Sequence, residues 1–395
     1  PEPMRAMVQN VSASIGEKKC VCRLTSSFRY GMIYAVIPTV TERERRTYTV
    51  PEAVVRHTYI IVQKTPVFNW FFSIRRIFHE ITGKDRSFGM ADRTETTAHR
   101  ARVFTGAATA IVTPFAADGT IDYPSLGRMI ARQIDGAIDA LVVCGTTGEA
   151  ASLTGDEYRA ILRYTVDAVQ GRVPVIAGCG SNDTATAIEL AKCACTLGAD
   201  ALLVITPYYN KATPTGLIRH FTAIADASDK PILLYNVPSR TGVDIPLSVY
   251  PVLAAHPRIV GVKEASGDLA KAAHIVATCG PDFALYSGSD DSILPNLSIG
   301  ADGVISVVSN LLPRETHLLC ERYFQGDTVG AWEIQRALLP LIDALFAEVN
   351  PIPVKTACGM LGLCQPTLRL PLCEMEPPHR AALEKALADW HLYAN

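Results

Sequence analysis

Five polar segments of the sequence each lie at the end of an apolar run or just after it, and together they hold residue types that carbonyl chemistry needs. They are 145–149, 206–210, 235–240, 263–264 and 287–290. Lys263, which directly follows the apolar run 259–262, is the most informative residue among them. Burial disfavours the charged ammonium form of a lysine, and a neutral amine attacks carbonyl carbons. The competing interpretation is a salt bridge between Lys263 and its neighbour Glu264.

The other polar residues of these segments are each ambiguous alone but consistent together. Tyr235 is either a packing residue or a phenol beside the amine. Thr146 and Thr147 either cap the following helix or bind a carboxylate through their hydroxyl and backbone N–H groups. Arg240 suits a second carboxylate, because a guanidinium binds one through two parallel hydrogen bonds. An amine, a phenol, hydroxyls and two anion sites around one centre indicate Schiff-base chemistry on a keto acid.

Short apolar runs alternate with amphipathic segments from residue 107 onward. The runs are 110–112, 141–143, 173–176, 202–205, 232–235, 259–262, 283–286 and 304–307. Such runs, flanked by turn residues, are typical of strands buried on both faces. Helix signals lie between them: Asp122 and Thr154 are candidate N-caps, Glu157 completes a capping box, and Gly198 is a candidate helix stop.

Eight strand–helix units in about 220 residues predict an α/β fold, a (β/α)8 TIM barrel over residues 101–325. A doubly wound open sheet is the runner-up, but Gly178-Cys179-Gly180 lacks the third glycine of a nucleotide-binding fingerprint. In a barrel the carboxyl ends of the strands meet at one mouth, so the five polar segments converge there. Residues 326–395 are predicted as a C-terminal helical region, broken by prolines at 350–353 and 377–378.

Residues 1–100 differ from the rest of the chain in charge and in pattern. They hold 16 Lys and Arg against 9 Asp and Glu, whereas the whole chain has 37 against 39. Their apolar segments follow no clear period, so residues 1–100 are treated as an N-terminal extension of unassigned function. Three interpretations stay open: a region that is not part of the mature enzyme, a targeting or regulatory extension, and a small added domain.

Composition argues against several classes of protein. A net charge of −2 and a pI near 6.6 are not those of a chain that coats nucleic acid or an anionic membrane. No apolar window reaches the roughly 18 residues that suggest a transmembrane helix. The eleven cysteines show no zinc-ligand spacing. We therefore expect a cytoplasmic protein with no nucleic-acid or membrane partner and no metal.

Five motifs relate the region from about Phe104 to about Leu392 to a known family. They are GTTGE at 145–149, TPYYNK at 206–211, LYNVPSRTG at 234–242, GVKEASG at 261–267 and NPIPVK at 350–355. The region resembles the dihydrodipicolinate synthase family of class I pyruvate-dependent aldolases. The resemblance implies condensation of pyruvate with L-aspartate 4-semialdehyde to 4-hydroxy-tetrahydrodipicolinate, in the diaminopimelate and lysine pathway. It also implies no metal or organic cofactor and a homotetramer built as a dimer of dimers.

The same resemblance implies catalytic roles for four residues. Lys263 is expected to form the Schiff base with pyruvate, and Tyr235 to donate and accept protons beside it. Thr146 and Tyr209 are expected to extend Tyr235 into a proton relay, in which Tyr209 reaches into the site of the neighbouring subunit.

Four further residues are implied to bind the substrates. Thr147 is expected to bind the pyruvate carboxylate and Arg240 the carboxylate of the aldehyde, while Gly288 and Ile305 line the pocket through their backbone. The alternatives are another pyruvate aldolase, such as N-acetylneuraminate lyase, and a non-catalytic binding barrel. Arg240 favours the synthase, because the lyases generally lack an arginine at this position.

The family's lysine-binding cleft between paired subunits is only partly matched here. Tyr208 and Asn182 match positions of that cleft. Gly155 and Tyr158 stand where inhibited bacterial members commonly have histidines, and Thr186 stands where they have a glutamate. A carboxylate beside the ammonium group of a bound amino acid contributes a charge-assisted hydrogen bond of about 1.5–3 kcal/mol. Threonine offers only a neutral hydroxyl.

We therefore predict that lysine inhibits this protein weakly or not at all. Loss of the carboxylate at position 186 weakens lysine binding by roughly ten- to a hundredfold. The measurement is the initial rate at saturating pyruvate across a lysine titration. Half-inhibition at submillimolar lysine would contradict the prediction.

Overall fold

The computed structural model describes residues 8–15, 18–27, 32–36, 102–390 and 392, and the chain divides into two compact units, Pro1–Thr94 and Glu95–Asn395. In the first unit β1 (Val8–Ile15), β2 (Lys18–Ser27) and β3 (Met32–Val36) pair in that order as an antiparallel sheet. No strand was predicted there, because the apolar residues follow no clear period. The expected boundary near residue 100 lies outside the described residues.

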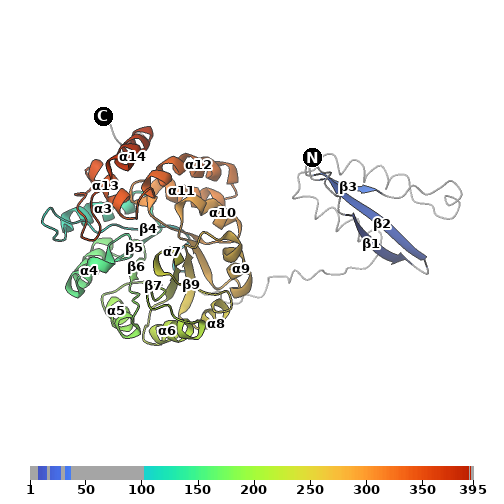
Figure 1. Ribbon diagram of the computed structural model, residues 1–395, viewed down its shortest axis with the longest axis horizontal. Helices are drawn as coiled ribbons and strands as arrows, with labels where there is room; N and C mark the ends of the chain where they lie inside the picture. Colours follow the sequence, from blue (N-terminus) through green and yellow to red (C-terminus); the bar gives the residue numbers. More distant parts are fainter. Residues whose placement is uncertain (1–7, 16–17, 28–31, 37–101, 391, 393–395) are drawn as a thin grey trace. The chain divides into compact units, whose positions relative to one another are not determined.

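The second unit contains a closed barrel of parallel strands that follow one another in chain order (Figure 1). The strands are β4 (Gly106–Ala110), β5 (Ala140–Val143), β6 (Val175–Gly178), β7 (Ala201–Ile205), β8 (Ile232–Asn236), β9 (Ile259–Glu264), β10 (Ala284–Ser287) and β11 (Gly303–Ser306). β11 pairs with β4 and closes the barrel. The predicted TIM barrel is confirmed, and the open sheet is wrong.

Helices surround the barrel and connect its strands (Figure 1). They are α3 (Tyr123–Asp135), α4 (Gly155–Val169), α5 (Thr184–Thr196), α6 (Pro214–Asp226), α7 (Pro238–Thr241), α8 (Tyr250–Ala254), α9 (Leu269–Cys279), α10 (Ile293–Ser298) and α11 (Pro313–Phe324). Asp122 caps α3, and Thr154 forms the predicted capping box with Glu157 on α4. Gly198 follows the end of α5 with φ +91°, as expected of a helix stop.

In the described part of the chain, three more helices follow the barrel: α12 (Thr328–Leu345), α13 (Ile352–Met360) and α14 (Pro377–Asp389). Helix is interrupted before both proline segments, since α12 ends at Leu345 and α13 begins only at Ile352. Pro353, Pro377 and Pro378 lie in the first turns of α13 and α14. A helix tolerates proline there, since the first N–H groups have no partner within the helix. Residues 361–376 are not helical. None of the described helices is long and apolar enough to cross a membrane.

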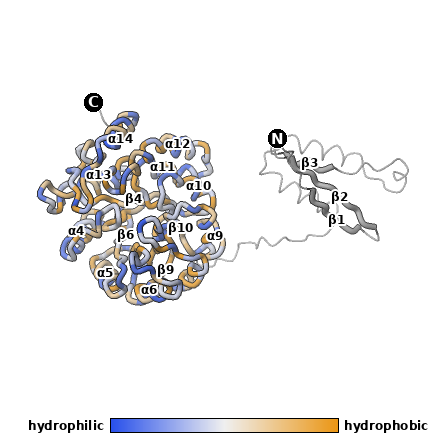
Figure 2. The backbone as a smooth tube through the Cα atoms, in the orientation of Figure 1, coloured by the Kyte–Doolittle hydropathy of each residue, from blue (hydrophilic) through white to orange (hydrophobic). Residues whose placement is uncertain are grey.

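Apolar side chains pack in two layers, one inside the barrel and one between the strands and the helices. On β8, Leu233 and Tyr235 belong to the inner layer and Leu234 to the outer one. Successive side chains of a strand therefore belong to different layers. The helices that cover the outer layer carry both apolar and polar residues along their length (Figure 2).

The first strand differs from its prediction. The apolar run 110–112 was expected to form it, but the ladder covers Gly106–Ala110. The small side chains of Ala108 and Ala110 fit the crowded interior of the barrel. Ile111 and Val112 are buried beyond the last pair of the ladder, Ala110 with Val142. A prediction based on apolar residues alone therefore placed this strand a few residues too late in the chain.

Closure of the barrel predicts a strict steric limit at Gly303. A Cβ added there would lie 1.9 Å from the carbonyl oxygen of Gly106 on the paired strand. That contact is with backbone, so β11 and β4 must separate to relieve it. We expect Gly303→Ala to lower the free energy of unfolding by about 3 kcal/mol, measured by urea denaturation.

Gly216→Ala is the matched control. A Cβ at Gly216, within α6, would meet only ordinary contacts at 3.4 Å. Alanine in a helix is favoured over glycine by about 1 kcal/mol, so this variant should be neutral or more stable. Equal stability of the two variants would show that β11 and β4 tolerate the added methyl group.

Candidate active site

Lys263 and Tyr235 lie side by side inside the barrel, where β8 and β9 reach their carboxyl ends. The two residues are partners in the β8–β9 ladder. The Lys263 Nζ lies 4.5 Å from the centroid of the Tyr235 ring. Both residues are buried, with exposed fractions of 5% and 7%. Tyr286 of β10 is the ladder partner of Lys263 on the other side of β9. Its ring stacks on that of Phe104 in the interior of the barrel.

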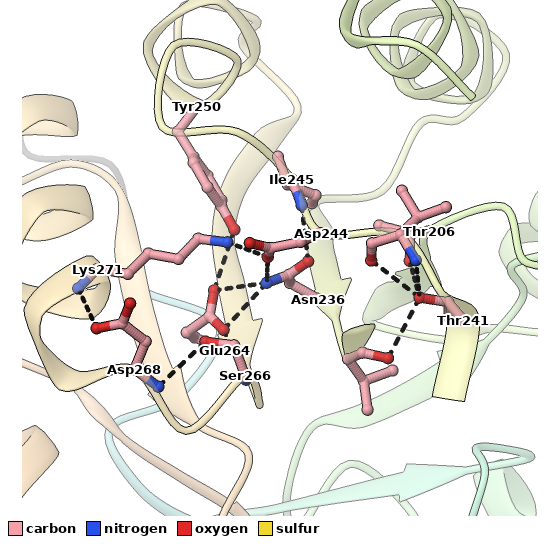
Figure 3. Close-up of polar contacts among 12 residues, drawn as sticks. Thr206, Asn236, Thr241, Asp244, Ile245, Tyr250, Glu264, Ser266, Asp268 and Lys271 are labelled. Atoms are coloured by element: carbon pink, nitrogen blue, oxygen red, sulfur yellow. Dashed lines mark hydrogen bonds and ion pairs between the residues drawn. The ribbon is translucent and has the colours of Figure 1, made fainter. Parts of the chain in front are cut away.

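The alternative interpretation, a salt bridge between Lys263 and Glu264, is wrong. Glu264 faces the outer side of β9, where its carboxylate accepts from Asn236 Nδ2 at 3.0 and 3.1 Å, Tyr250 OH at 3.1 Å and Ser266 N at 2.8 Å (Figure 3). Among the described residues, no ion pair or hydrogen bond is formed by the Lys263 side chain. Its amine is therefore not held by a neighbouring acid.

The outer network extends from Glu264 to α9 (Figure 3). Asn236 Nδ2 also donates to Asp244 at 2.8 Å, and Lys271 of α9 forms an ion pair with Asp244. Burial, and then the nearby Glu264 charge, raises the pKa of Tyr250. Asn236 and Glu264 directly follow Tyr235 and Lys263 in the chain, so this network fixes the strand ends that carry them. The sequence signal that could have identified Asn236 and Glu264 is the polar residue at the end of each apolar run.

The loop after β5 carries Thr146 and Thr147. Thr147 is buried, and its Oγ1 accepts a hydrogen bond from Asn350 Nδ2 at 2.9 Å. The helix-capping alternative is wrong for both threonines: Thr154 caps α4, and the short helix η1 (Ala150–Ser152) begins after Glu149 without a side-chain cap. The threonine hydroxyls do not serve helix ends.

Asn350 connects two of the predicted substrate ligands. Its Nδ2 binds Thr147, and its carbonyl oxygen accepts from Arg240 Nη2 at 2.9 Å. Its Oδ1 is buried and has no hydrogen-bond partner among the described residues. Sequence reasoning noted only the motif around Asn350 and assigned the residue no role. Its contacts join positions 203 and 110 residues apart, a separation that no local pattern reveals.

Gly288 directly follows β10, and Ile305 lies within β11. The N–H of Gly288 donates to the carbonyl oxygen of Glu264 at 2.7 Å. A Cβ at Gly288 would lie 2.5 Å from the Cβ of Ala265, so a side chain there would push these strands apart. Ile305 is buried within the interior layer.

Asp290 is a buried carboxylate, and the sequence predicted no role for it beyond its place at the end of the polar segment 287–290. Its Oδ2 accepts from the N–H groups of Val307 and Val308 at 2.9 and 2.8 Å, so it orders the turn after β11. Burial raises the pKa of Asp290, and these hydrogen bonds and the Lys263 charge oppose that increase. Asp290 thus connects the ends of β10 and β11.

Tyr209 is not brought together with Lys263 and Tyr235 within one chain. It has a left-handed backbone conformation, with φ +70°, and its side chain is 89% exposed. Tyr208 is also exposed. Both tyrosines are therefore exposed within a single chain.

The other residues of the expected lysine cleft have defined positions. The Asn182 carbonyl oxygen accepts from Asn210 Nδ2 at 2.9 Å. The Thr186 hydroxyl is engaged with Asp183 in the N-cap of α5, at 2.7 Å. Tyr158 is buried in the layer between strands and helices, and burial raises its pKa. The Thr186 hydroxyl is thus already hydrogen-bonded, and Tyr158 is not exposed at the surface.

Among the described residues, no group of three or more His, Cys, Asp or Glu side chains is arranged to hold a metal ion. The structure groups the predicted site residues in two sets: Lys263 lies against Tyr235, and Asn350 links Thr147 to Arg240.

Comparison with known proteins identifies one family. The model of the Dihydrodipicolinate synthetase family matches residues 103–389. The 4-hydroxy-tetrahydrodipicolinate synthase of Lachnoclostridium phytofermentans is 49% identical over 288 residues, which are 73% of this chain and 97% of the relative. That of Clostridium tetani is 48% identical over 288 residues, 73% of this chain and 98% of the relative.

Solved structures agree with the sequence comparison. Dihydrodipicolinate synthase from Aquifex aeolicus matches with a TM-score of 0.72 and 42% identity, over 73% of this chain and 99% of that chain. The enzyme from Cyanidioschyzon merolae with lysine bound matches with a TM-score of 0.72 and 40% identity, over 74% and 100%. The similarity spans almost the whole of each relative.

Proposed function

Since the chain belongs to the dihydrodipicolinate synthetase family, we propose that its barrel condenses pyruvate with L-aspartate 4-semialdehyde to give 4-hydroxy-tetrahydrodipicolinate. The chain is thus a lyase of the diaminopimelate and lysine pathway. The observation that supports this function most directly is the buried Lys263 amine, which has no ion-pair partner among the described residues and lies against Tyr235. An amine in that state can form an imine with a keto acid.

The proposed reaction begins at Lys263. Its amine adds to the keto carbon of pyruvate and water leaves, which gives an imine. Loss of a proton from the pyruvate methyl group gives an enamine, whose carbon attacks the aldehyde of the second substrate. The amino group of that substrate then attacks the imine carbon, closes the ring and releases Lys263. The imine is the electron sink, so this mechanism uses no metal or organic cofactor.

The remaining predicted residues have matching roles in this proposal. Tyr235 moves protons to and from the reacting atoms, together with Thr146 and with Tyr209 of a neighbouring copy. Thr147 binds the pyruvate carboxylate. Arg240 binds the carboxylate of the aldehyde substrate, for which its planar guanidinium is suited. Gly288 and Ile305 line the pocket.

We propose a cytoplasmic homotetramer, a dimer of dimers, as the working assembly. The exposure of Tyr209 and Tyr208 supports at least a dimer, because tyrosines are enriched where surfaces meet. N-acetylneuraminate lyase activity is less consistent with this chain, since Arg240 has no counterpart in most lyases and every relative described above is a synthase.

We predict that borohydride with pyruvate traps a covalent adduct on Lys263. Reduction of the imine gives a stable secondary amine, which peptide mapping by mass spectrometry locates. Lys263→Ala should form no adduct and should lower kcat by orders of magnitude, because no other group replaces the imine. An adduct on a different lysine would refute the assignment.

A pair of coupled assays is the control for substrate identity. The wild-type protein should turn over pyruvate with L-aspartate 4-semialdehyde and should not cleave N-acetylneuraminate. The reverse result, with the adduct still on Lys263, would assign the chain to the lyases. No adduct and no turnover would support a binding protein.

We also predict that Tyr209→Phe slows proton transfer but leaves imine formation intact. Trapping by borohydride should match the wild type, whereas kcat should fall about a hundredfold, a typical contribution of general acid–base catalysis. Stopped-flow trapping and steady-state rates measure the two steps. A monomer that retains full activity in analytical ultracentrifugation and assay would contradict a role in a neighbouring site.

A further inference from the structure

A buried ion pair joins the C-terminal region of the chain to the loop that follows β5. Lys355 of α13 places its Nζ 2.6 Å from Oε1 of Glu149, and the two side chains are 0% and 2% exposed. The same ammonium donates to the carbonyl oxygen of Thr367 at 2.7 Å and lies 3.8 Å from the centroid of the Phe115 ring. Lys355 ends the NPIPVK motif, and the proposed reaction gives it no role.

Neither charge of this pair has access to water. Burial lowers the pKa of Lys355, and attraction to Glu149 opposes that change. A buried charge that loses its partner is strongly disfavoured. Each side chain therefore holds the other in place.

The backbone of Glu149 depends on this anchoring. Its conformation is left-handed, with φ +54° and ψ +37°, which is unfavourable for a residue with a side chain. Such conformations persist where surrounding contacts hold them. The Glu149 N–H donates to the carbonyl oxygen of Thr146 at 3.0 Å. The position of Glu149 thus determines where the Thr146 backbone lies.

Arg369 attaches the same loop at two further points. Its backbone N–H donates to Oε2 of Glu149 at 3.2 Å, and its guanidinium donates to the carbonyl oxygen of Ser152 at 2.9 Å. It also pairs with Glu157 at 2.5 Å, and the hydrogen bond to Arg369 holds the pKa of Glu157 at about 2. Contacts from the C-terminal region therefore reach both ends of the segment 149–152.

We propose that Glu149 and Lys355 are positioning residues for the reaction: their buried ion pair sets where Thr146 and Thr147 lie at the barrel mouth. Neither residue touches the reacting atoms in this proposal. The inference rests on the proposed function, in which Thr147 binds the pyruvate carboxylate and Thr146 moves protons. Its specific consequence is that loss of the pair raises the KM for pyruvate and lowers kcat.

The test uses the full chain with two kinds of variant. The double variant Glu149→Gln/Lys355→Met removes both charges together, which leaves no unpaired buried charge and so favours a folded protein. Glu149→Asp keeps both charges and shortens the connection by one methylene group, so it remains informative if the double variant does not fold. The measurements are the melting temperature, kcat, the KM for each substrate, and the pyruvate concentration that gives half-maximal borohydride trapping.

We expect kcat/KM for pyruvate to fall between about ten- and a hundredfold in both variants, the size of effect that small displacements of positioned groups produce. Half-maximal trapping should need correspondingly more pyruvate, and the KM for L-aspartate 4-semialdehyde should change less. Wild-type kinetics in a folded variant of either kind would overturn the proposal and leave the ion pair a structural feature only.

Arg102→Met is the matched control. Arg102 forms a partly buried ion pair with Asp302 at 2.6 Å, at the amino ends of the strands and therefore opposite the mouth. This variant should lose stability and keep wild-type kinetic constants. An equal kinetic loss in the control would overturn the proposal. Absence of any Lys263 adduct in the wild type would instead refute the proposed function.

Discussion

The two-residue period of a β-strand is the constraint on which the site depends. Successive side chains of β8 and β9 point to opposite faces, so Tyr235 and Lys263 enter the barrel while Asn236 and Glu264 face the helices. The Glu264 carboxylate is fully engaged on that outer face. Because the acid next to Lys263 in the chain is on the other side of the strand, Glu264 does not pair with the amine in the interior.

The mouth of the barrel is assembled from segments that are far apart in the chain. Asn350 reaches Thr147 and Arg240, and Lys355 reaches Glu149. The C-terminal region is therefore more than a helical addition to the barrel, because its residues hydrogen-bond to Thr147, Arg240 and Glu149. The barrel alone would leave the loop after β5 with one side unsupported.

Most of the fold was predictable because its signals are local. The apolar runs, the N-cap Asp122 and the capping box at Thr154 each act within a few residues. The first strand was predicted at 110–112 and lies at 106–110, because its small residues suit a crowded interior yet carry little apolar signal. The proline segments mark interruptions between helices, as expected, and the prolines inside α13 and α14 lie in the first turn, where a helix tolerates them.

The sequence by itself determined the residue types of the site and their order along the chain: an amine, a phenol, threonines and an arginine, each at the end of a strand or just after it. It also left the choice between a functional and a structural interpretation open for each one. Tertiary structure alone decided which acid faces which cation, because Glu264 and Lys263 are neighbours in the chain but lie on opposite faces of β9. It alone joined Glu149 to Lys355, 206 residues away, because such a contact depends on the packing of the whole barrel and no local pattern specifies it.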